Sequence, residues 1–444
     1  MANEILGRLF GFRRPKYYLN LDALAVTDLA TPSLISVSLR SGGLPCVPRV
    51  KPGDEVSPGR FLGHDGTRPA VACPVKGKVV GVVGAPDIRG GRQGEAVLIE
   101  PADGPDQVFA PLNPEKEAPE KLWARMGEAG IITDSENPRP LGEVIGPDAG
   151  VKVETLIVSA LDREPEQSSA LAVYQERSGD TARAAAMLGR MAGAKAVLLA
   201  VADKLAGEAG RTSERHGVKV LSIKPHYPKS LEPMLALAAG GGEGVRVAAA
   251  EAALAALDAV AAGRVQARKV VTFIGPAERA RANYRVSLGM RLKDIMEAAG
   301  LRPRDGDKVI MGGPLRGYTQ YSLDAAVDQG VDAVTLIPSE AVVKWSDEPC
   351  VSSGACVSVC PVNLQPQMLA RYSEFGLYDR TEEWGVFNCI ECGLCAAACV
   401  GRRPLLQWIR LAKAEVTRKK AAEKACEAPP PAPDQADGQS AAAG

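Results

Sequence analysis

The cysteines between positions 350 and 399 are the residues whose type and spacing say most about chemistry. Seven of the ten cysteines in the chain fall in this interval. One run, "CIECGLCAAAC", has the spacing C-x2-C-x2-C-x3-C, with Cys389, Cys392, Cys395 and Cys399 at the repeated positions. Two-residue gaps wrap a loop around one cubane and direct three sulfurs toward three irons, so this run predicts an iron–sulfur centre.

An earlier run, "CVSSGACVSVC", has the same length but lacks one cysteine, because Ser353 stands at the second ligand position. In two-cluster ferredoxins the fourth cysteine of each run binds the cluster of the other run. This rule predicts one complete and one incomplete ligand set. The sets are Cys389, Cys392, Cys395 and Cys360 for cluster one, and Cys350, Cys356 and Cys399, with Ser353 at the fourth position, for cluster two.

Ser353 leaves three states open for cluster two. The site holds a 3Fe–4S centre, or a 4Fe–4S centre with a serine oxygen or water at one corner, or no cluster. The alternatives to iron are a zinc site and reduced, metal-free thiols. Zinc takes four tetrahedral ligands, which seven cysteines at this spacing do not suit. His64, His216 and His226 lie far from the cysteines in sequence, and we expect ordinary surface or core histidines.

Composition excludes several other classes of protein. Lys plus Arg number 53 and Asp plus Glu number 53, so no strong field favours nucleic acid or anionic lipid. Apolar stretches are too short to cross a bilayer, and the start of the chain has no signal-peptide pattern, which predicts a cytosolic compartment. Clustered cysteines in a chain of 444 residues argue against a disulfide framework.

The first half of the chain suggests two modules joined by a linker. Residues 1–44 are mixed and give no clear prediction. Short Val-rich runs cut by Gly and Pro predict a small all-β domain over residues 45–101, and a stretch rich in Pro and charge predicts a linker over 102–121. Strand-like and helical segments then alternate, which predicts a parallel α/β domain over 122–245.

The strands of that α/β domain are expected at Glu154–Leu161, Ala194–Ala202 and Gly217–Lys224. The stretch "EGVRVAAAEAALAALDAVAAGRVQ" that follows is rich in alanine and is expected to be helical.

The second half predicts three further parts. Residues 268–330 combine strands with a helix from about Arg291 and predict a compact α+β module. Residues 339–414 carry the cysteine runs. Residues 415–444 predict a basic helix followed by a disordered, low-complexity tail.

This order of parts resembles the C subunit of Rnf-type ion-translocating oxidoreductases, from about Leu39 to Val416. The motifs that carry the resemblance are "VKPGDEV", "CPVKGKVV", "VIMGGPLRGY", "CVSSGACVSVCPVNLQPQML" and "FNCIECGLCAAAC". The resemblance implies a multidomain α/β and α+β fold. Its parts would be a barrel-sandwich (lipoyl-like) β domain, a parallel α/β domain like the complex I flavoprotein, an SLBB β-grasp module and a two-cluster ferredoxin-like helical domain.

In that family the α/β domain binds FMN and NADH, and a flavin converts a two-electron donor into one-electron steps. The glycine-rich loop of the family reads roughly G-L-G-G-A-G-F-P. The corresponding stretch here is "GEAGIITDSENPRPLGE", in which Asp134 and Glu136 would repel a nucleotide phosphate. "SALDREP" stands where the family has roughly N-A-A-E-C-E-P, and Glu164 is the one weak candidate for cofactor binding. These departures argue against FMN and NADH in this chain, and no catalytic residue is assigned.

The leading hypothesis is a peripheral electron-transfer subunit that relays electrons through iron–sulfur clusters in an Rnf-like complex that couples electron transfer to ion translocation. Its partners would be the other membrane and iron–sulfur subunits, its membrane contact would run through them, and its place would be the cytoplasmic face. One alternative is an active NADH-oxidising, FMN-containing dehydrogenase subunit. Another is a ligand-binding scaffold whose clusters are structural.

Overall fold

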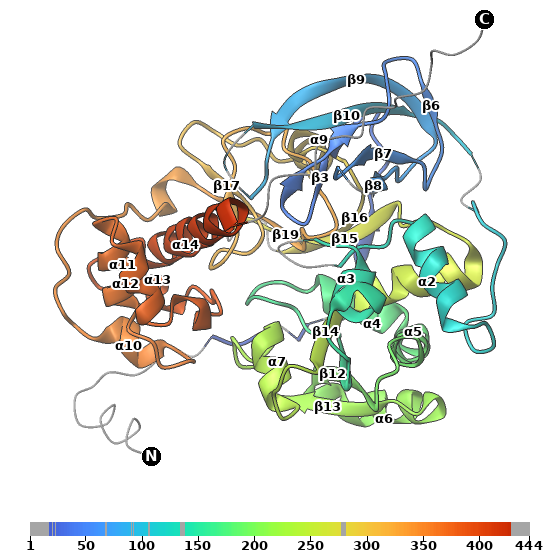
Figure 1. The fold of residues 1–444 in the computed structure, drawn as a ribbon. Helices are drawn as coiled ribbons and strands as arrows, with labels where there is room; N and C mark the ends of the chain where they lie inside the picture. The colour runs from blue at the N-terminus through green and yellow to red at the C-terminus, as the bar shows by residue number, and fades with distance from the viewer. Residues whose placement is uncertain are drawn as a thin grey trace, which may run out of the picture. The chain divides into compact units, whose positions relative to one another are not determined.

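The computed structural model describes residues 17–19, 21–22, 24–66, 69–89, 91, 93–104, 107–133, 138–276 and 281–427. The chain divides into two compact units. We call Lys16–Val343 the large unit and the part that begins at Lys344 the cysteine unit. In Figure 1 the large unit runs from blue to light orange, and the cysteine unit carries the darker orange and red helices.

Short antiparallel strands form the first part of the large unit. One sheet has the order β2-β10-β9-β6, another has the order β5-β7-β8, and β3 pairs with β4. The strands are β2 (Ile35–Ser38), β3 (Arg40–Ser41), β4 (Leu44–Pro45), β5 (Val47–Pro48), β6 (Glu55–Val56), β7 (Phe61–His64), β8 (Pro69–Ala72), β9 (Gly77–Pro86) and β10 (Gln93–Pro101). The long strands β9 and β10 arch over this part in Figure 1. Strand β2 comes from the segment 1–44, whose residues carry no clear pattern of their own.

Side chains from these sheets meet in one core. Ile35, Leu62, Val79, Val97 and Ile99 are each at most 1% exposed and pack together. Every second side chain of a strand points to the same face, so the alternating Val and Ile positions supply this core.

Two of the scattered cysteines belong to the same core. Cys46 and Cys73 are 3% and 0% exposed, and burial raises the pKa of the Cys73 thiol to about 11. A buried thiol that stays protonated behaves as a small apolar side chain, so these residues need no metal to explain them.

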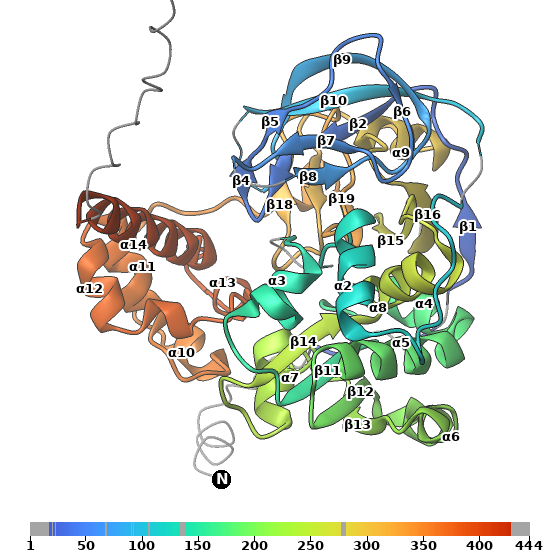
Figure 2. The ribbon, with the colours of Figure 1, turned by 45° about the vertical axis from the view of Figure 1, so that its right-hand side comes forward.

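A parallel sheet with the order β13-β12-β11-β14 follows. Its strands are β11 (Thr155–Ser159), β12 (Ala196–Ala202), β13 (Lys219–Ile223) and β14 (Val245–Ala249). The associated helices are α2 (Pro119–Glu128), α3 (Leu141–Ile145), α4 (Ser169–Glu176), α5 (Ser178–Met191), α6 (Ala206–Ser213), α7 (Glu232–Ala238) and α8 (Ala250–Leu257). Figure 2 shows the four strands side by side, with α5 and α6 against β12 and β13. The three predicted strands and their parallel pairing are confirmed.

The expectation of one helix over residues 243–266 was wrong in its first part. Val245–Ala249 is strand β14, which pairs along its whole length with β11. Only Ala250–Leu257 is α-helical, and Asp258–Ala262 continues it as a π-turn. Val245 and Val247 favour a strand, and pairing with β11 overrides the helix propensity of the two alanines, which is a weak preference.

A six-stranded sheet with the order β1-β16-β15-β19-β17-β18 completes the large unit. Its strands are β1 (Val26–Asp28), β15 (Arg268–Ile274), β16 (Ala282–Ser287), β17 (Lys308–Met311), β18 (Tyr318–Thr319) and β19 (Ala333–Ile337), and helix α9 (Leu292–Ala298) covers it. The expected helix near Arg291 is present. Strand β19 lies between β15 and β17, so the sheet continues past residue 330.

Buried charges join the α/β part to this sheet. The Lys269 side chain is fully buried, and its Nζ lies 3.2 Å from the Asp332 carboxylate and 3.5 Å from that of Glu251 on α8. Asp332 also pairs with Arg163. Because every charge in this group has a partner of opposite sign, the junction avoids the cost of an unpaired buried ion.

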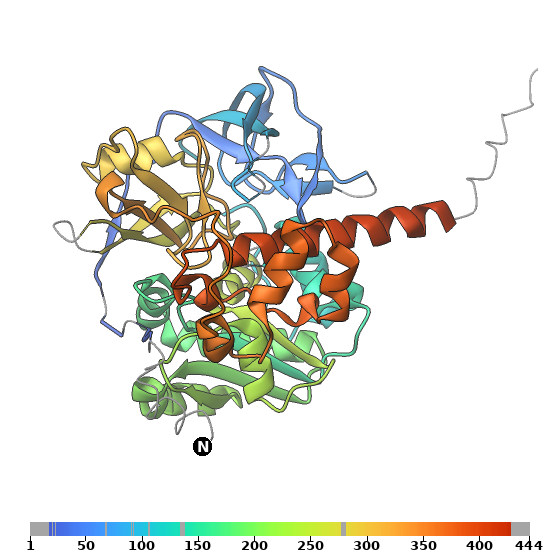
Figure 3. The same ribbon diagram turned by 90° about the vertical axis from the view of Figure 1, so that its left-hand side faces the viewer.

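The cysteine unit is helical. Its helices are α10 (Ala355–Val359), α11 (Pro366–Glu374), α12 (Tyr378–Glu383), α13 (Leu394–Ala397) and α14 (Leu405–Glu427). Figure 3 shows α14, in red, as the longest of them, and it packs along α11 and α12. Leu369, Val386, Leu405, Ile409 and Ala412 form the core and are each at most 2% exposed.

The predicted basic helix corresponds to α14, and the predicted tail from residue 428 lies outside the described residues. Within the described ranges, every helix is either too short or too polar to span a bilayer.

Candidate metal centre

The two cysteine runs form loops with the same backbone conformation. Each residue of the first loop lies 39 positions before its counterpart in the second, so Cys350 corresponds to Cys389 and Ser353 corresponds to Cys392. Short helices begin at matching points, because α10 follows Gly354 and α13 follows Gly393. The two glycines have φ values of 72° and 75°.

Non-glycine residues also adopt left-handed backbone conformations at matching positions. Ser352 and Glu391 have φ values of 55° and 52°, and Asn363 and Arg402 have values of 56° and 50°. Such a conformation costs about 1 kcal/mol or more for a residue with a side chain. Both loops therefore accept the same local strain in order to hold the same shape.

Backbone N–H groups point at the sulfurs in the same pattern in both loops. The N–H of Ser352 donates to Cys350 Sγ at 3.4 Å, and the N–H of Glu391 donates to Cys389 Sγ at 3.4 Å. The fourth cysteines are matched too, as Leu364 N–H donates to Cys360 Sγ at 3.3 Å, and Arg403 N–H donates to Cys399 Sγ at 3.4 Å. Such hydrogen bonds stabilise negative charge on sulfur, and they tune the potential of iron–sulfur centres.

Thiols of the two cysteine runs influence the pKa values of one another. Burial raises the pKa of Cys356, and repulsion from Cys399 and Cys350 raises it further. Burial also raises the pKa of Cys389, and Cys360 adds repulsion. Both repulsions run between the two runs, as the predicted crossing of ligands requires.

Cys395, another thiol of the second loop, is influenced by cysteines of both runs. Burial raises the pKa of Cys395 well above its ordinary value, and repulsion from Cys389, Cys392 and Cys356 adds to it. Helices α10 and α13, which carry Cys356 and Cys395, are in contact. This contact brings the helices that follow the two loops together within the unit.

The complete ligand set is covered by α14, which brings positive charge to it. Lys413 Nζ donates to the carbonyl oxygen of Cys389 at 2.7 Å and to the Glu391 carboxylate at 2.8 Å. Arg410 Nε also donates to Glu391 at 2.8 Å. Although burial raises the pKa of Glu391, these two cations hold it below its usual range.

The incomplete set has a cation of its own. Arg403 is 7% exposed, pairs with the Glu374 carboxylate and donates to the carbonyl oxygen of Glu348 at 2.6 Å. Its backbone N–H is the one directed at Cys399 Sγ. A bound cluster with its thiolates is anionic, so guanidinium and ammonium groups beside both ligand sets fit such an occupant.

No described group of three or more His, Cys, Asp or Glu side chains is arranged around a single ion position. In a cubane each thiolate binds a different iron, so the sulfurs surround a body larger than one ion. Matching loops, N–H groups directed at sulfur and nearby cations fit the iron–sulfur clusters that the spacing predicts.

The stretch that corresponds to the nucleotide loop begins at the end of α2 and runs into α3. Its residues 134–137, including Asp134 and Glu136, lie outside the described residues. Gly130 has a φ of 62°, and a Cβ built on it would lie 2.3 Å from the Cβ of Ala72. A glycine is therefore required there by close packing against β8.

Glu164, the weak candidate for cofactor binding, is 3% exposed, and its carboxylate is hydrogen-bonded to backbone groups of the protein. Its carboxylate accepts hydrogen bonds from the backbone N–H of Leu315 at 2.8 Å and of Arg316 at 3.3 Å. Both donors belong to the "GGPLRGY" motif. Gly313 of this motif packs so closely that a Cβ there would lie 2.5 Å from the Glu164 carboxylate.

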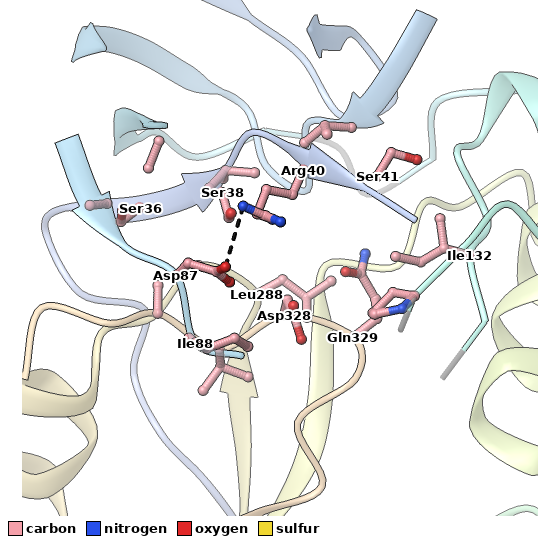
Figure 4. Close-up of a pocket in the computed structure, with 18 of the residues that line it drawn as sticks. Ser36, Ser38, Arg40, Ser41, Asp87, Ile88, Ile132, Leu288, Asp328 and Gln329 are labelled. Atoms are coloured by element: carbon pink, nitrogen blue, oxygen red, sulfur yellow. Dashed lines mark ion pairs between the residues drawn. The ribbon is translucent and has the colours of Figure 1, made fainter. Parts of the chain in front are cut away.

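A cavity of about 230 Å3 lies elsewhere in the large unit (Figure 4). Figure 4 shows Ser36 and Ser38 on one side and Asp328 and Gln329 on the other. Two ion pairs line it, Arg40 with Asp87 at 3.3 Å and Arg89 with Asp328 at 2.6 Å. Polar and apolar groups both line it, and these four charges occur in pairs.

The cysteines could be placed from the sequence, but the charged residues around them could not. Lys413 and Arg410 lie in a helix whose contact with the second loop is set by tertiary packing, and Arg403 carries no recognisable motif. The cavity of Figure 4 was also missed, because its walls come from segments far apart in sequence.

Residues 343–400 match a protein-family model described as a 4Fe–4S dicluster domain. The C subunit of the Na+-translocating ferredoxin:NAD+ oxidoreductase complex of Acetobacterium woodii is 26% identical over 409 residues, which cover 86% of this chain and 90% of that protein. The C subunit of the ion-translocating oxidoreductase complex of Methanosarcina acetivorans is 27% identical over 447 residues, covering 90% and 95%. A crystal structure of NAD+-reducing NiFe-hydrogenase in the H2-reduced state covers 73% of this chain and 70% of its own, with a TM-score of 0.46 and 13% identity.

Proposed function

Because this chain belongs to the family of C subunits of Rnf-type ion-translocating oxidoreductases, we propose that it is the peripheral electron-transfer subunit of such a complex. It relays electrons through iron–sulfur clusters in the cysteine unit. Its partners are the other subunits of the complex, which supply the ion path and the contact with the membrane at its cytoplasmic face.

The observation that carries this proposal is the pair of cysteine loops with matching left-handed backbone positions and matching N–H groups directed at sulfur. Cluster one takes Cys389, Cys392, Cys395 and Cys360, and cluster two takes Cys350, Cys356 and Cys399. Both predicted ligand sets belong to one helical unit, in which α10 and α13 are in contact. Thiolate-bound iron supplies the redox chemistry, and the protein fixes the centres and tunes their potentials.

We assign the rest of the chain to three domains that accompany the cluster-binding unit. Residues 45–101, extended by β2, form the barrel-sandwich domain, residues 122–245, extended by β14, form the α/β domain, and residues 268–330, extended by β19, form the SLBB β-grasp module. The glycine-poor stretch after α2 and the engaged Glu164 disfavour FMN and NADH here. Without FMN and NADH in this chain, electrons reach the clusters from a protein partner rather than from the hydride of NADH.

Potentiometric titration of the anaerobically reconstituted full chain, followed by electron paramagnetic resonance, tests the relay. We expect at least one reducible 4Fe–4S signal, and the same preparation of Cys389→Ala should lack it. A chain that binds iron but gives no redox-dependent signal would favour the scaffold hypothesis, in which the clusters are structural.

The dehydrogenase hypothesis is tested on the same material. We expect acid treatment to release no flavin, and NADH to leave the visible absorbance of the clusters unchanged. Bleaching by NADH together with stoichiometric flavin would make this chain the NADH-oxidising subunit.

A further inference from the structure

The two cysteine loops differ at one ligand position, and this difference coincides with a difference in solvent exposure. Cys392 is 7% exposed, whereas Ser353 at the matching position is exposed, as are Val351, Ser352 and Gly354 around it. The backbone of the two loops is otherwise the same. The first loop thus keeps the shape of a cluster-binding loop, while one corner lacks a thiolate and faces solvent.

We propose that one iron of cluster two has no protein ligand, and that this iron is exchangeable and takes an external thiolate. The inference rests on the proposed function, because it requires a cluster in the first loop. Iron in these centres is bound preferentially by thiolate sulfur. An alcohol is a much weaker acid than a thiol, so the exposed hydroxyl of Ser353 stays protonated and hydrated instead of replacing the missing sulfur.

The surroundings of this corner suit a small ligand. Ser352, Ser353 and Gly354 carry small side chains or none. Val351 and Val400, which follow the ligands Cys350 and Cys399, are 64% and 63% exposed. A small uncharged thiol can reach the corner across this surface without displacing a buried group. Its sulfur loses a proton to solvent and replaces water on the iron.

Loss of the same iron is a balanced step. A 4Fe–4S centre in the 2+ state that releases one Fe2+ ion and one electron becomes a 3Fe–4S centre in the 1+ state and keeps its four sulfides. In the test the electron goes to ferricyanide. In the complete set, Cys392 holds the equivalent iron with a buried thiolate, so this loss is confined to cluster two.

The test compares the full-length chain with three variants after anaerobic reconstitution. Ser353→Cys restores the missing thiolate, Ser353→Ala removes the hydroxyl, and Ser352→Cys adds a thiol to the neighbouring exposed position as a matched control. Each protein is treated with ferricyanide and a chelator, its iron and sulfide are counted, and its paramagnetic resonance spectrum is recorded. In a second arm, 2-mercaptoethanol is added to the dithionite-reduced protein.

We expect the unmodified chain, Ser353→Ala and Ser352→Cys to lose about one iron per chain, keep their sulfide, and show a 3Fe–4S signal that Fe2+ and dithionite reverse. 2-Mercaptoethanol should change their spectra. Ser353→Cys should keep its iron and show no 3Fe–4S signal. 2-Mercaptoethanol should leave its spectrum unchanged.

Several results would overturn the proposal. Greater iron loss in Ser353→Ala than in the unmodified chain would make the serine oxygen a ligand. A single cluster in the unmodified chain, with a second cluster only in Ser353→Cys, would mean that the first loop is empty. Both results leave the proposed relay through cluster one standing, whereas the absence of iron from every protein would remove the proposed function itself.

Discussion

The Nζ atom of Lys413 lies 2.7 Å from the carbonyl oxygen of Cys389 and 2.8 Å from the carboxylate of Glu391. Helix α14 thus brings an ammonium group, 20% exposed, to the loop of the complete ligand set. Attraction to Lys413 already lowers the pKa of the Cys389 thiol against the larger effect of burial. The same positive charge stabilises the more negative, reduced state of a cluster.

Replacing Lys413 with glutamine should therefore lower the reduction potential of cluster one. A partly exposed charge near the cluster is worth about 1 kcal/mol, which corresponds to roughly 40 mV for a one-electron couple. Potentiometric titration followed by paramagnetic resonance measures the shift. Lys419→Gln is the matched control, since Lys419 lies on the same helix and pairs with Asp379 at 2.8 Å. Equal shifts in both variants would mean that Lys413 has no particular influence on the cluster.

Single cysteine replacements should reveal the crossing of the two runs. Cys360→Ala should abolish the same signal that Cys389→Ala abolishes, although Cys360 belongs to the other run. Cys399→Ala should leave that signal in place, because the spacing rule assigns Cys399 to the other cluster with Cys350 and Cys356. The spectra of the dithionite-reduced variants, read with their iron content, check this. If Cys399→Ala removes the signal of cluster one and Cys360→Ala does not, each run holds its own cluster.

Asp162 should make the stability of the protein depend on pH. Burial raises the pKa of this carboxyl to about 7, against hydrogen bonds from the N–H groups of Ala170 and Leu171. Because the unfolded value is near 4, the folded state binds the extra proton. Its contribution to stability is therefore present below about pH 4 and is lost as pH rises through about 7, with a slope of at most about 1.4 kcal/mol per pH unit.

Asp162→Asn removes this titration while keeping an oxygen that can accept one of the N–H groups. The difference in unfolding free energy between variant and unmodified chain should grow in favour of the variant between pH 4 and pH 7. Chemical denaturation at several pH values measures it. A difference that is constant over this range would show that Asp162 stays ionised in the folded protein.

Removal of the Glu164 side chain should destabilise the large unit without changing iron content. Glu164→Ala leaves the N–H groups of Leu315 and Arg316 without this acceptor, at a cost of about 2–4 kcal/mol. Glu128→Ala, at an exposed site where Glu128 pairs with Arg125 at 3.3 Å, should cost less than about 1 kcal/mol. Denaturant unfolding and iron analysis provide the two readouts, and an equal cost in both variants would contradict the structural role of Glu164.

Features whose signal lies in neighbouring residues of the sequence could be predicted. Apolar runs placed the three strands β11, β12 and β13, and the cysteine spacing predicts the ligands of both clusters. Strand β14 was missed because the alanine-rich sequence that follows it hid the strand preference of Val245 and Val247. Strand β2 was missed because its partner β10 lies far along the chain.

The same limit applies to the candidate centre. The contact between Lys413 and Cys389 exists only once α14 has packed on the second loop, so no local sequence pattern predicts it. The correspondence between Ser353 and Cys392, by contrast, was readable from spacing alone, and the matching backbone adds a reason to expect a cluster beside Ser353.

Iron and acid-labile sulfide per chain, measured on protein purified without oxygen, test the central claim most directly. With both ligand sets occupied we expect about eight sulfides and about seven or eight irons per chain, and a brown protein. The Cys389→Ala, Cys350→Ala double variant should bind markedly less. A colourless, iron-free chain that remains so after anaerobic reconstitution with iron and sulfide would contradict a relay built on these cysteines.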